Sequence, residues 1–285
     1  TDPSKVTYTN GVQNEWLVHP AFTASAENGG GFGEIAGIWV GKFEATGTKE
    51  NVTVKPGERA LIEMTINEQY KAGLNATLEE RMNLKSHMAK NSEWGAIAYL
   101  GHSKYGANGQ KIEQNANTLC YTGGTENLKE IYKTNKEQST TQNAYGVYDM
   151  SGGAWERTAS YLTYKQASND LENNGGTNKG DLYGTESERN QSTMYKTVYQ
   201  AKDADESSSY ELTQSKKGDA IYETSNGYET LNSSWYSSYS TFPHTGGPFF
   251  IRGDQYGDKN YSTFCFSGTN GTTVYGGGFR IILVI

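Results

Sequence analysis

The chain has 285 residues, of which 34% are hydrophobic and 12% aromatic, and its formal net charge at pH 7 is -7. This acidic balance excludes a general nucleic-acid-binding protein, because such a protein presents a basic face to the phosphates. No apolar run approaches the roughly 20 residues that a membrane-spanning helix needs, so no membrane insertion is expected. The first residues carry no charged-then-apolar leader, which indicates a mature or truncated product.

The first regular element is expected at Glu34–Glu44, which is rich in aromatic and β-branched residues and is bounded by glycines. This composition predicts a strand that follows the glycine-rich loop Asn28–Gly33. A short helix is expected at Ile66–Ala72.

Two further helices are predicted by apolar spacing and capping residues. The first runs from Thr77 to Lys90, where Thr77 and Glu80 have the spacing of a capping box. The second begins at Asn91 and continues to Leu100, with Asn91 or Ser92 as its N-cap.

Two polar tracts, residues 101–142 and 164–234, interrupt this pattern. Because the entropy of closing a loop rises only slowly with its length, both are interpreted as insertions on one scaffold, and residues 1–285 as a single domain. The second tract has few aliphatic residues and is expected to lie outside the scaffold. Two cysteines, Cys120 and Cys265, cannot form a disulfide framework, and a single bridge between them stays open.

The C-terminal stretch, residues 249–285, has two apolar ends around a polar middle. Both ends are predicted as buried strands, and Phe279–Ile285 as an inner strand, because five consecutive aliphatic residues do not suit a solvated edge. The middle is rich in Tyr, Ser, Thr, Asn and Gly. Tyr offers a large contact area with few rotors to freeze, and the small polar residues offer adaptable hydrogen bonds. This composition is typical of a binding surface. By the alternation of a strand, Phe250, Phe264, Phe266 and Phe279 are expected to face inward and the intervening polar and tyrosine positions outward.

Three blocks of sequence resemble the formylglycine-generating-enzyme (sulfatase-modifying factor) superfamily. They are Ile38–Glu44, then Asn91–Tyr99 followed by Asn143–Glu156, and finally Phe250–Gly253 leading to Gly278–Arg280. The run from Tyr145 to Glu156 is the most specific element. The resemblance implies an α+β fold, the C-type-lectin-like fold of the formylglycine-generating-enzyme subtype, with long polar insertions. Within it, Trp155 is expected to fill the core, and Glu156 to cap a segment or pair with Arg280.

Within that superfamily the chain is most similar to the variable proteins of diversity-generating retroelements. Those proteins bind ligands at phage or bacterial surfaces, and adenine-directed mutagenesis rewrites their C-terminal segment. The resemblance implies a variable region at residues 249–285 and no catalytic activity. It also implies an adhesin-like function outside the cell, on a bacterial surface or a virion, with a protein or other cell-surface receptor as partner.

The residues expected to bind the ligand combine the polar middle of the C-terminal stretch with a preceding aromatic loop. Most have side chains that an Asn codon altered at its first two positions can encode, whereas Gln255 and Lys259 do not. The full set is Asp254, Gln255, Tyr256, Asp258, Lys259, Asn260, Tyr261, Ser262, Ser267, Thr269, Asn270, Thr272, Thr273 and Tyr275, with Trp235, Tyr236 and Tyr239 from the preceding loop.

Neither a catalytic residue nor a cofactor is expected. Formylglycine-generating enzymes bind copper through two cysteines close in sequence, but only Cys265 lies in that region, and one thiolate is a poor copper site. The four histidines lack metal-ligand spacing and no lectin calcium motif occurs, although a structural Ca²⁺ held by loop oxygens stays open. Two alternative functions also stay open: an oxidase like the superfamily's enzymes, and a structural subunit of a virion or pilus.

Overall fold

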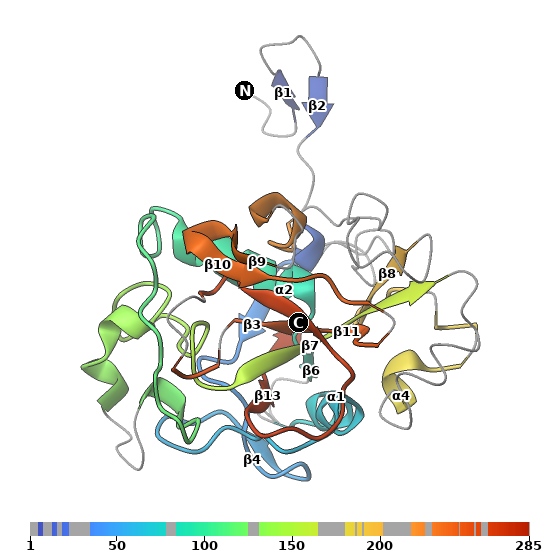
Figure 1. The fold of residues 1–285 in the computed structure, drawn as a ribbon, viewed down its shortest axis with the longest axis horizontal. Coiled ribbons are helices and arrows are strands. Elements are labelled where there is room, and N and C mark those ends of the chain that lie inside the picture. The colour runs from blue at the N-terminus through green and yellow to red at the C-terminus, as the bar shows by residue number, and fades with distance from the viewer. Residues whose placement is uncertain are drawn as a thin grey trace.

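The computed structural model gives the chain a mixed α+β fold with few helices (Figure 1). The residues that it describes are 5–7, 13–15, 19–22, 35–77, 84–124, 131–164, 180–185, 187–189, 191–201, 218–225, 230–244, 246–253, 255–257 and 262–284. The α+β class predicted from the sequence is therefore confirmed.

The regular elements are short, with the exception of one long strand and one helix of three turns. The strands are β1 (Lys5–Thr7), β2 (Gln13–Glu15), β3 (Ile38–Val40), β4 (Thr46–Gly47), β5 (Val52–Thr53), β6 (Lys85–Met88), β7 (Trp155–Tyr164), β8 (Thr197–Ala201), β9 (Thr230–Ser234), β10 (Ser238–Ser240), β11 (Phe249–Arg252), β12 (Phe266–Thr269), β13 (Gly277–Phe279) and β14 (Ile281–Val284). The helices are α1 (Ile66–Leu74), α2 (Asn91–His102) and α4 (Gly180–Tyr183), with 3-10 turns η1 (Pro20–Phe22), η3 (Thr122–Gly124), η4 (Ile131–Lys133), η5 (Lys136–Gln138), η7 (Tyr222–Thr224) and η8 (Trp235–Ser237).

The main sheet is organised around β7, the longest strand. Its order is β13-β7-β11-β12-β10-β9, and β8 also pairs with β7. Antiparallel β11 lies along one edge of β7, while parallel β13 and β8 follow each other along the other edge. The C-terminal strands β11, β12 and β13 thus all lie in the same sheet as β7, and this fixes the ends of the loops between them.

A second, three-stranded sheet has the C-terminal strand at its centre. Antiparallel β3 and β6 flank β14, which places Ile282 opposite both Val40 and His87. Ile281, Ile282 and Val284 are buried. The prediction that the C-terminal segment forms an inner strand is confirmed.

Helix α1 confirms the helix expected at Ile66–Ala72. Thr65 and Glu68 form a capping box: Glu68 N donates to Thr65 Oγ1 at 3.2 Å, and Thr65 N donates to Glu68 Oε2 at 2.9 Å. Two of the amides that a helix start leaves unpaired are thereby satisfied.

Helix α2 begins at Asn91 as predicted, but its N-cap is Lys90 rather than Asn91 or Ser92. The Lys90 amide donates to Glu93 Oε2 at 2.8 Å. Asn91 is instead buried against β7, where its side chain accepts a hydrogen bond from Thr158 Oγ1 at 2.9 Å. The prediction of the cap was wrong because this side chain is used in the core.

The helix predicted from Thr77 to Lys90 was also wrong. Residues 85–88 form strand β6, and residues 78–83 lie outside those that the structure describes. Pairing with β14 supplies the backbone hydrogen bonds of β6 from another part of the chain, and this tertiary pairing overrides the local helical pattern.

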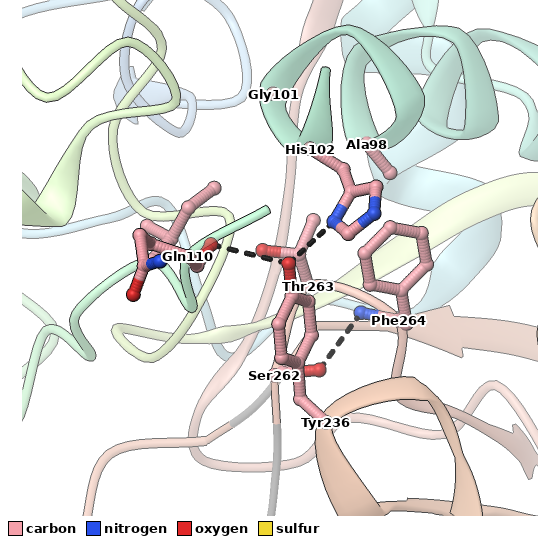
Figure 2. Close-up of a pocket in the computed structure, with 9 residues that line it drawn as sticks. Ala98, Gly101, His102, Gln110, Tyr236, Ser262, Thr263 and Phe264 are labelled. Atoms are coloured by element: carbon pink, nitrogen blue, oxygen red, sulfur yellow. Dashed lines mark hydrogen bonds between the residues drawn. The ribbon is translucent and has the colours of Figure 1, made fainter. Parts of the chain in front are cut away.

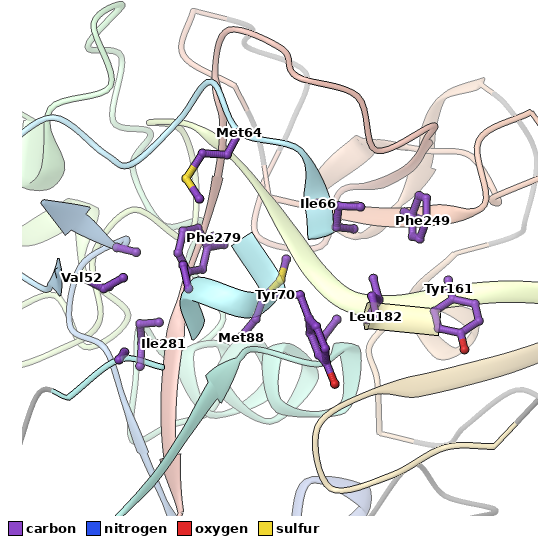
Figure 3. Close-up of a cluster of buried hydrophobic side chains, with 14 of the residues drawn as sticks. Val52, Met64, Ile66, Tyr70, Met88, Tyr161, Leu182, Phe249, Phe279 and Ile281 are labelled. Carbon is purple, nitrogen blue, oxygen red and sulfur yellow. The ribbon is translucent and has the colours of Figure 1, made fainter. Parts of the chain in front are cut away.

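The largest hydrophobic cluster lies between α1 and the two sheets (Figure 3). Met64, Ile66, Phe279 and Ile281 meet there. The cluster also contains Leu182, Tyr183 and Val198 from the tract 164–234. The expectation that this tract lies outside the scaffold was therefore wrong for α4 and β8. Few aliphatic residues were present, but tyrosines and β-sheet pairing compensate for them.

Candidate binding face

The ligand-binding residues predicted from the sequence lie partly within the described structure. Asp254, Asp258, Lys259, Asn260 and Tyr261 lie outside the described residues. The others follow β11, lie on β12 or in the loop between β12 and β13, or belong to η8 and β10. Two aromatic clusters form among them.

The first group, called here the Tyr256–Tyr275 cluster, consists of Trp155, Gln255, Tyr256, Tyr275 and Arg59. The rings of Tyr256 and Tyr275 meet nearly at right angles, at 86°, with their centroids 6.4 Å apart. The guanidinium of Arg59 lies 5.3 Å from the centroid of the Tyr275 ring, within the range of a cation–π contact. Tyr275 nevertheless remains 45% exposed, so it presents an aromatic surface to solvent.

Hydrogen bonds fix the backbone beneath this cluster. The Tyr256 amide donates to Gly153 O at 3.2 Å, and Trp155 N donates to Gly276 O at 2.7 Å. The Trp155 indole N–H donates to Gln255 Oε1 at 2.9 Å. Trp155 is half-buried, so the expectation that it fills the core was wrong; its indole N–H instead binds Gln255 in the turn after β11.

The second group, called here the Trp235 cluster, contains Trp235, Tyr236, His102, Tyr99 and Phe264. Figure 2 shows three of these side chains, Tyr236, His102 and Phe264. The Trp235 ring centroid lies 5.0 Å from those of both His102 and Phe264. Phe264 is buried, whereas Trp235 is 38% exposed. A buried ring thus supports an accessible one, an arrangement suited to a binding anchor.

The Trp235 cluster also contains an uncommon backbone. Tyr236 has a φ of 60° and the following Ser237 a φ of 57°. Non-glycine residues in this left-handed region are held there only when the surroundings fix them, and they gather at functional sites. Here the Tyr236 hydroxyl bonds to His102 Nδ1 and lies 3.1 Å from the carbonyl oxygen of Gly109, which accepts from it.

A hollow beside Tyr236 is too small for a ligand. It holds about 10 Å³, roughly the space of one water molecule. Its wall includes Thr263, whose buried Oγ1 has no hydrogen-bond partner in the described part of the chain and which Figure 2 shows next to Tyr236. This hollow has room for one water molecule, and the accessible ring of the cluster is that of Trp235.

Ser262 is a correction to the predicted site. It is 1% exposed and its Oγ bonds to Ser238 Oγ and accepts from Phe264 N at 3.2 Å. Its hydroxyl is used to hold the turn before β12, so it cannot reach a macromolecular ligand. The inward orientation predicted for Phe250, Phe264, Phe266 and Phe279 is confirmed, since all four are buried.

The remaining predicted residues differ in their accessibility. Asn270 and Thr273 are exposed, and the Asn270 side chain accepts from Thr272 N at 3.1 Å within its own turn. The half-buried ones are Gln255, Tyr256, Ser267, Thr269, Thr272, Tyr236 and Tyr239.

Both aromatic clusters rest on one segment that the sequence did not single out. Between α2 and η3, the carbonyls of Gly109 and Gln110 accept from Tyr236. Further along, Gln114 Nε2 donates to Gln255 O at 3.1 Å, and Thr118 O accepts from the Tyr275 hydroxyl at 3.2 Å. Residues 109–119 therefore contact the predicted binding loops at both clusters. Their polar composition predicted only an insertion, and no local signal marks these contacts.

Several ionisable groups of the described residues are buried and paired within the fold. Cys120 and Cys265 are not joined by a disulfide bond and both are buried, and burial raises the pKa of Cys120 to about 12. The predicted pairing of Glu156 with Arg280 is confirmed, with Arg280 Nε donating to Glu156 Oε2 at 3.1 Å. Within the described part of the chain, no three His, Cys, Asp or Glu side chains come together in a way that would hold a metal ion.

No protein-family model matches the chain, and none of the curated proteins compared with it is significantly similar. None of the helices in the described residues is long and apolar enough to cross a membrane.

Proposed function

We propose that the chain is a non-enzymatic receptor-binding protein that recognises its partner through the two aromatic clusters and the polar loops between them. The observation that carries this proposal is the exposure of Tyr275 and Trp235 on fixed positions: Trp235 packs against the buried ring of Phe264, and the Tyr275 hydroxyl donates to Thr118 O. Rigid aromatic anchors with a polar rim are the residues that dominate the energetics of protein interfaces.

We further propose that the fold is C-type-lectin-like, of the formylglycine-generating-enzyme subtype, and that the chain is a retroelement-diversified variable protein. The contacts of Arg280 support this proposal. Arg280 pairs with Glu156 and donates to Gly41 O at 2.7 Å and to Tyr148 O at 2.8 Å. Arg252 lies opposite Glu156 in the main sheet. The three blocks that carry the resemblance are thus joined in a single buried network.

In this proposal the strands β11, β12 and β13 are the constant scaffold, and the loops between them carry the variable positions. The partner is a protein or other cell-surface receptor, and the chain acts outside the cell, on a bacterial surface or a virion. Neither a cofactor nor a metal takes part. Gln255 fits the scaffold better than the variable set, because its side chain holds the Trp155 indole.

A cell-binding assay with matched tyrosine variants tests the proposal. Labelled protein is titrated onto intact bacterial cells of a panel of strains, with Tyr275→Ser as the test variant. The matched control is Tyr145→Ser, which removes a tyrosine that is 92% exposed and outside both clusters. We expect Tyr275→Ser to weaken binding at least about tenfold, the loss expected when an anchor worth about 1.4 kcal/mol is removed, and Tyr145→Ser to bind as the parent does.

Both variants should unfold at the parent's temperature, since exposed substitutions usually change stability by about 0.5 kcal/mol or less. Equal binding by Tyr275→Ser and the parent would contradict the proposed face.

A further inference from the structure

Four ionisable side chains meet beneath the Tyr256–Tyr275 cluster. Asp149 and Glu156 come from the block Asn143–Glu156, whereas Glu44 and Arg280 come from distant parts of the chain; each of the four side chains is at most 2% exposed. Glu44 Oε1 accepts from the amide of Ala154, the residue before Trp155, at 2.9 Å. The group therefore touches the turn on which the aromatic cluster is built.

Hydrogen-bond donors are shared unequally among the three acids. Glu156 receives two donors of Arg280. Asp149 Oδ1 receives Asn115 Nδ2 and the Gly123 amide, each at 2.9 Å. Among the residues that the structure describes, Glu44 receives only the Ala154 amide, and its buried Oε2 has no partner. An ionised Glu44 would therefore be the least compensated of the three.

The charges do not balance if all four groups are ionised. Three carboxylates against one guanidinium leave a net charge of -2 among four side chains that are almost fully buried. An uncompensated buried charge costs several kcal/mol, so such a group takes up a proton instead. The fifth titratable group that faces Glu44 is the thiol of Cys120, which could only add negative charge.

The pKa directions agree with this geometry. Burial, together with the charges of Asp149 and Glu156, raises the pKa of Glu44 well above its ordinary value, and Arg280 opposes this only in part. Burial also raises the pKa of Asp149 to about 6 and that of Glu156 to about 7, again against the influence of Arg280.

We propose that Glu44 is a neutral carboxylic acid in the folded protein, and that its ionisation at rising pH weakens the 149–155 turn that supports the Tyr256–Tyr275 cluster. The path is short. The Ala154 amide binds Glu44, the neighbouring Gly153 carbonyl accepts from the Tyr256 amide, and Trp155 N binds Gly276 O. The backbone support of the Tyr256–Tyr275 cluster therefore depends on pH, and this does not depend on which partner the cluster binds.

The direction of the effect follows from proton linkage. A group whose pKa is raised on folding stabilises the fold fully below its ordinary pKa, here 4.5, and this contribution is lost as pH rises through the folded pKa. The isosteric amide of Glu44→Gln carries no charge at any of these pH values. Relative to the parent, this variant should therefore gain stability as pH rises.

The test is urea unfolding of the parent and Glu44→Gln at a series of pH values from about 5 to 9. The folding equilibrium constant of the variant, divided by that of the parent, should rise with pH by up to about tenfold per pH unit. In the control Glu50→Gln, which alters an exposed glutamate, the same ratio should stay constant. A pH-independent ratio for Glu44→Gln would overturn the proposal.

Two further measurements keep the proposal testable if Glu44→Gln does not fold. In the parent at pH 7, the assigned ¹³C resonance of the Glu44 carboxyl should have the shift of a protonated acid, and the shift of a carboxylate would refute the proposal. Hydrogen exchange of the Tyr256 amide should accelerate with pH beyond the intrinsic tenfold per unit. An exchange rate that rises with pH no more steeply than the intrinsic rate would show that the turn does not respond to the ionisation of Glu44.

Discussion

Replacing Ile282 by Ala tests how much β14, the central strand of the three-stranded sheet, contributes to the stability of the fold. Ile282 is fully buried and lies opposite Val40 on one side and His87 on the other. An Ile→Ala change at such a site loses transfer energy and leaves a cavity, at a cost of about 2–5 kcal/mol. Since a domain of this kind is stable by only about 5–15 kcal/mol, the loss is a large share of the total.

The assay is urea unfolding followed by tryptophan fluorescence and circular dichroism, with Leu283→Ala as the matched control. Leu283 is the next residue of the same strand but is only partly buried, so its truncation should cost less. Deleting Ile281–Ile285 should prevent folding, because Ile281, Ile282 and Val284 together contribute about 4.5–9 kcal/mol, at about 1.5–3 kcal/mol each. An Ile282→Ala variant within about 0.5 kcal/mol of the parent would refute a central role for β14.

Two other substitutions probe the local supports of the fold. Arg280→Met should lower the free energy of unfolding, measured in urea at pH 7, by about 3–5 kcal/mol, because it leaves Glu156 and its acidic neighbours without their buried cation. An unchanged urea midpoint would mean that the Arg280–Glu156 pair does not stabilise the fold. Thr65→Ala should cost about 0.5–2 kcal/mol by removing the N-cap of α1, and a loss no greater than that of the exposed control Thr48→Ala would contradict this.

The parts of the fold that the sequence predicted are those determined by nearby residues. The run of aliphatic residues in β14 has no favourable place on a solvated surface, so its burial followed directly from composition. Helix α1 carries its capping box in four consecutive residues. The phenylalanines of the C-terminal stretch were placed inward by the alternation of a strand.

The parts that the sequence did not predict depend on distant partners. Lys85–Met88 carries a helical pattern, yet β14, almost two hundred residues later, pairs with it as a strand. Val198 lies in the core because β8 pairs with the second half of β7. Each of these contacts joins segments whose local composition gives no sign of the other.

In the candidate site, too, features set by residue type and position were predicted, whereas features set by distant contacts were not. The exposed Tyr275 and Trp235 were predicted from residue type and position. The buried Ser262 was not distinguished from its neighbours, because a small polar residue suits a binding loop and a buried turn equally well. Gln114 and Thr118 were missed, since their contacts with Gln255 and Tyr275 cross more than a hundred residues of chain.

The central claim, a binding face diversified by a retroelement, is tested most directly by sequencing the gene and its flanking DNA in many cells of the source population. We expect a reverse-transcriptase gene and a near-identical template repeat beside it. Substitutions should be confined to codons between residues 254 and 275, at adenines of the template, and should spare the buried Arg252, Phe264, Phe266 and Phe279. A locus without a template repeat, or substitutions spread evenly along the gene, would contradict the claim.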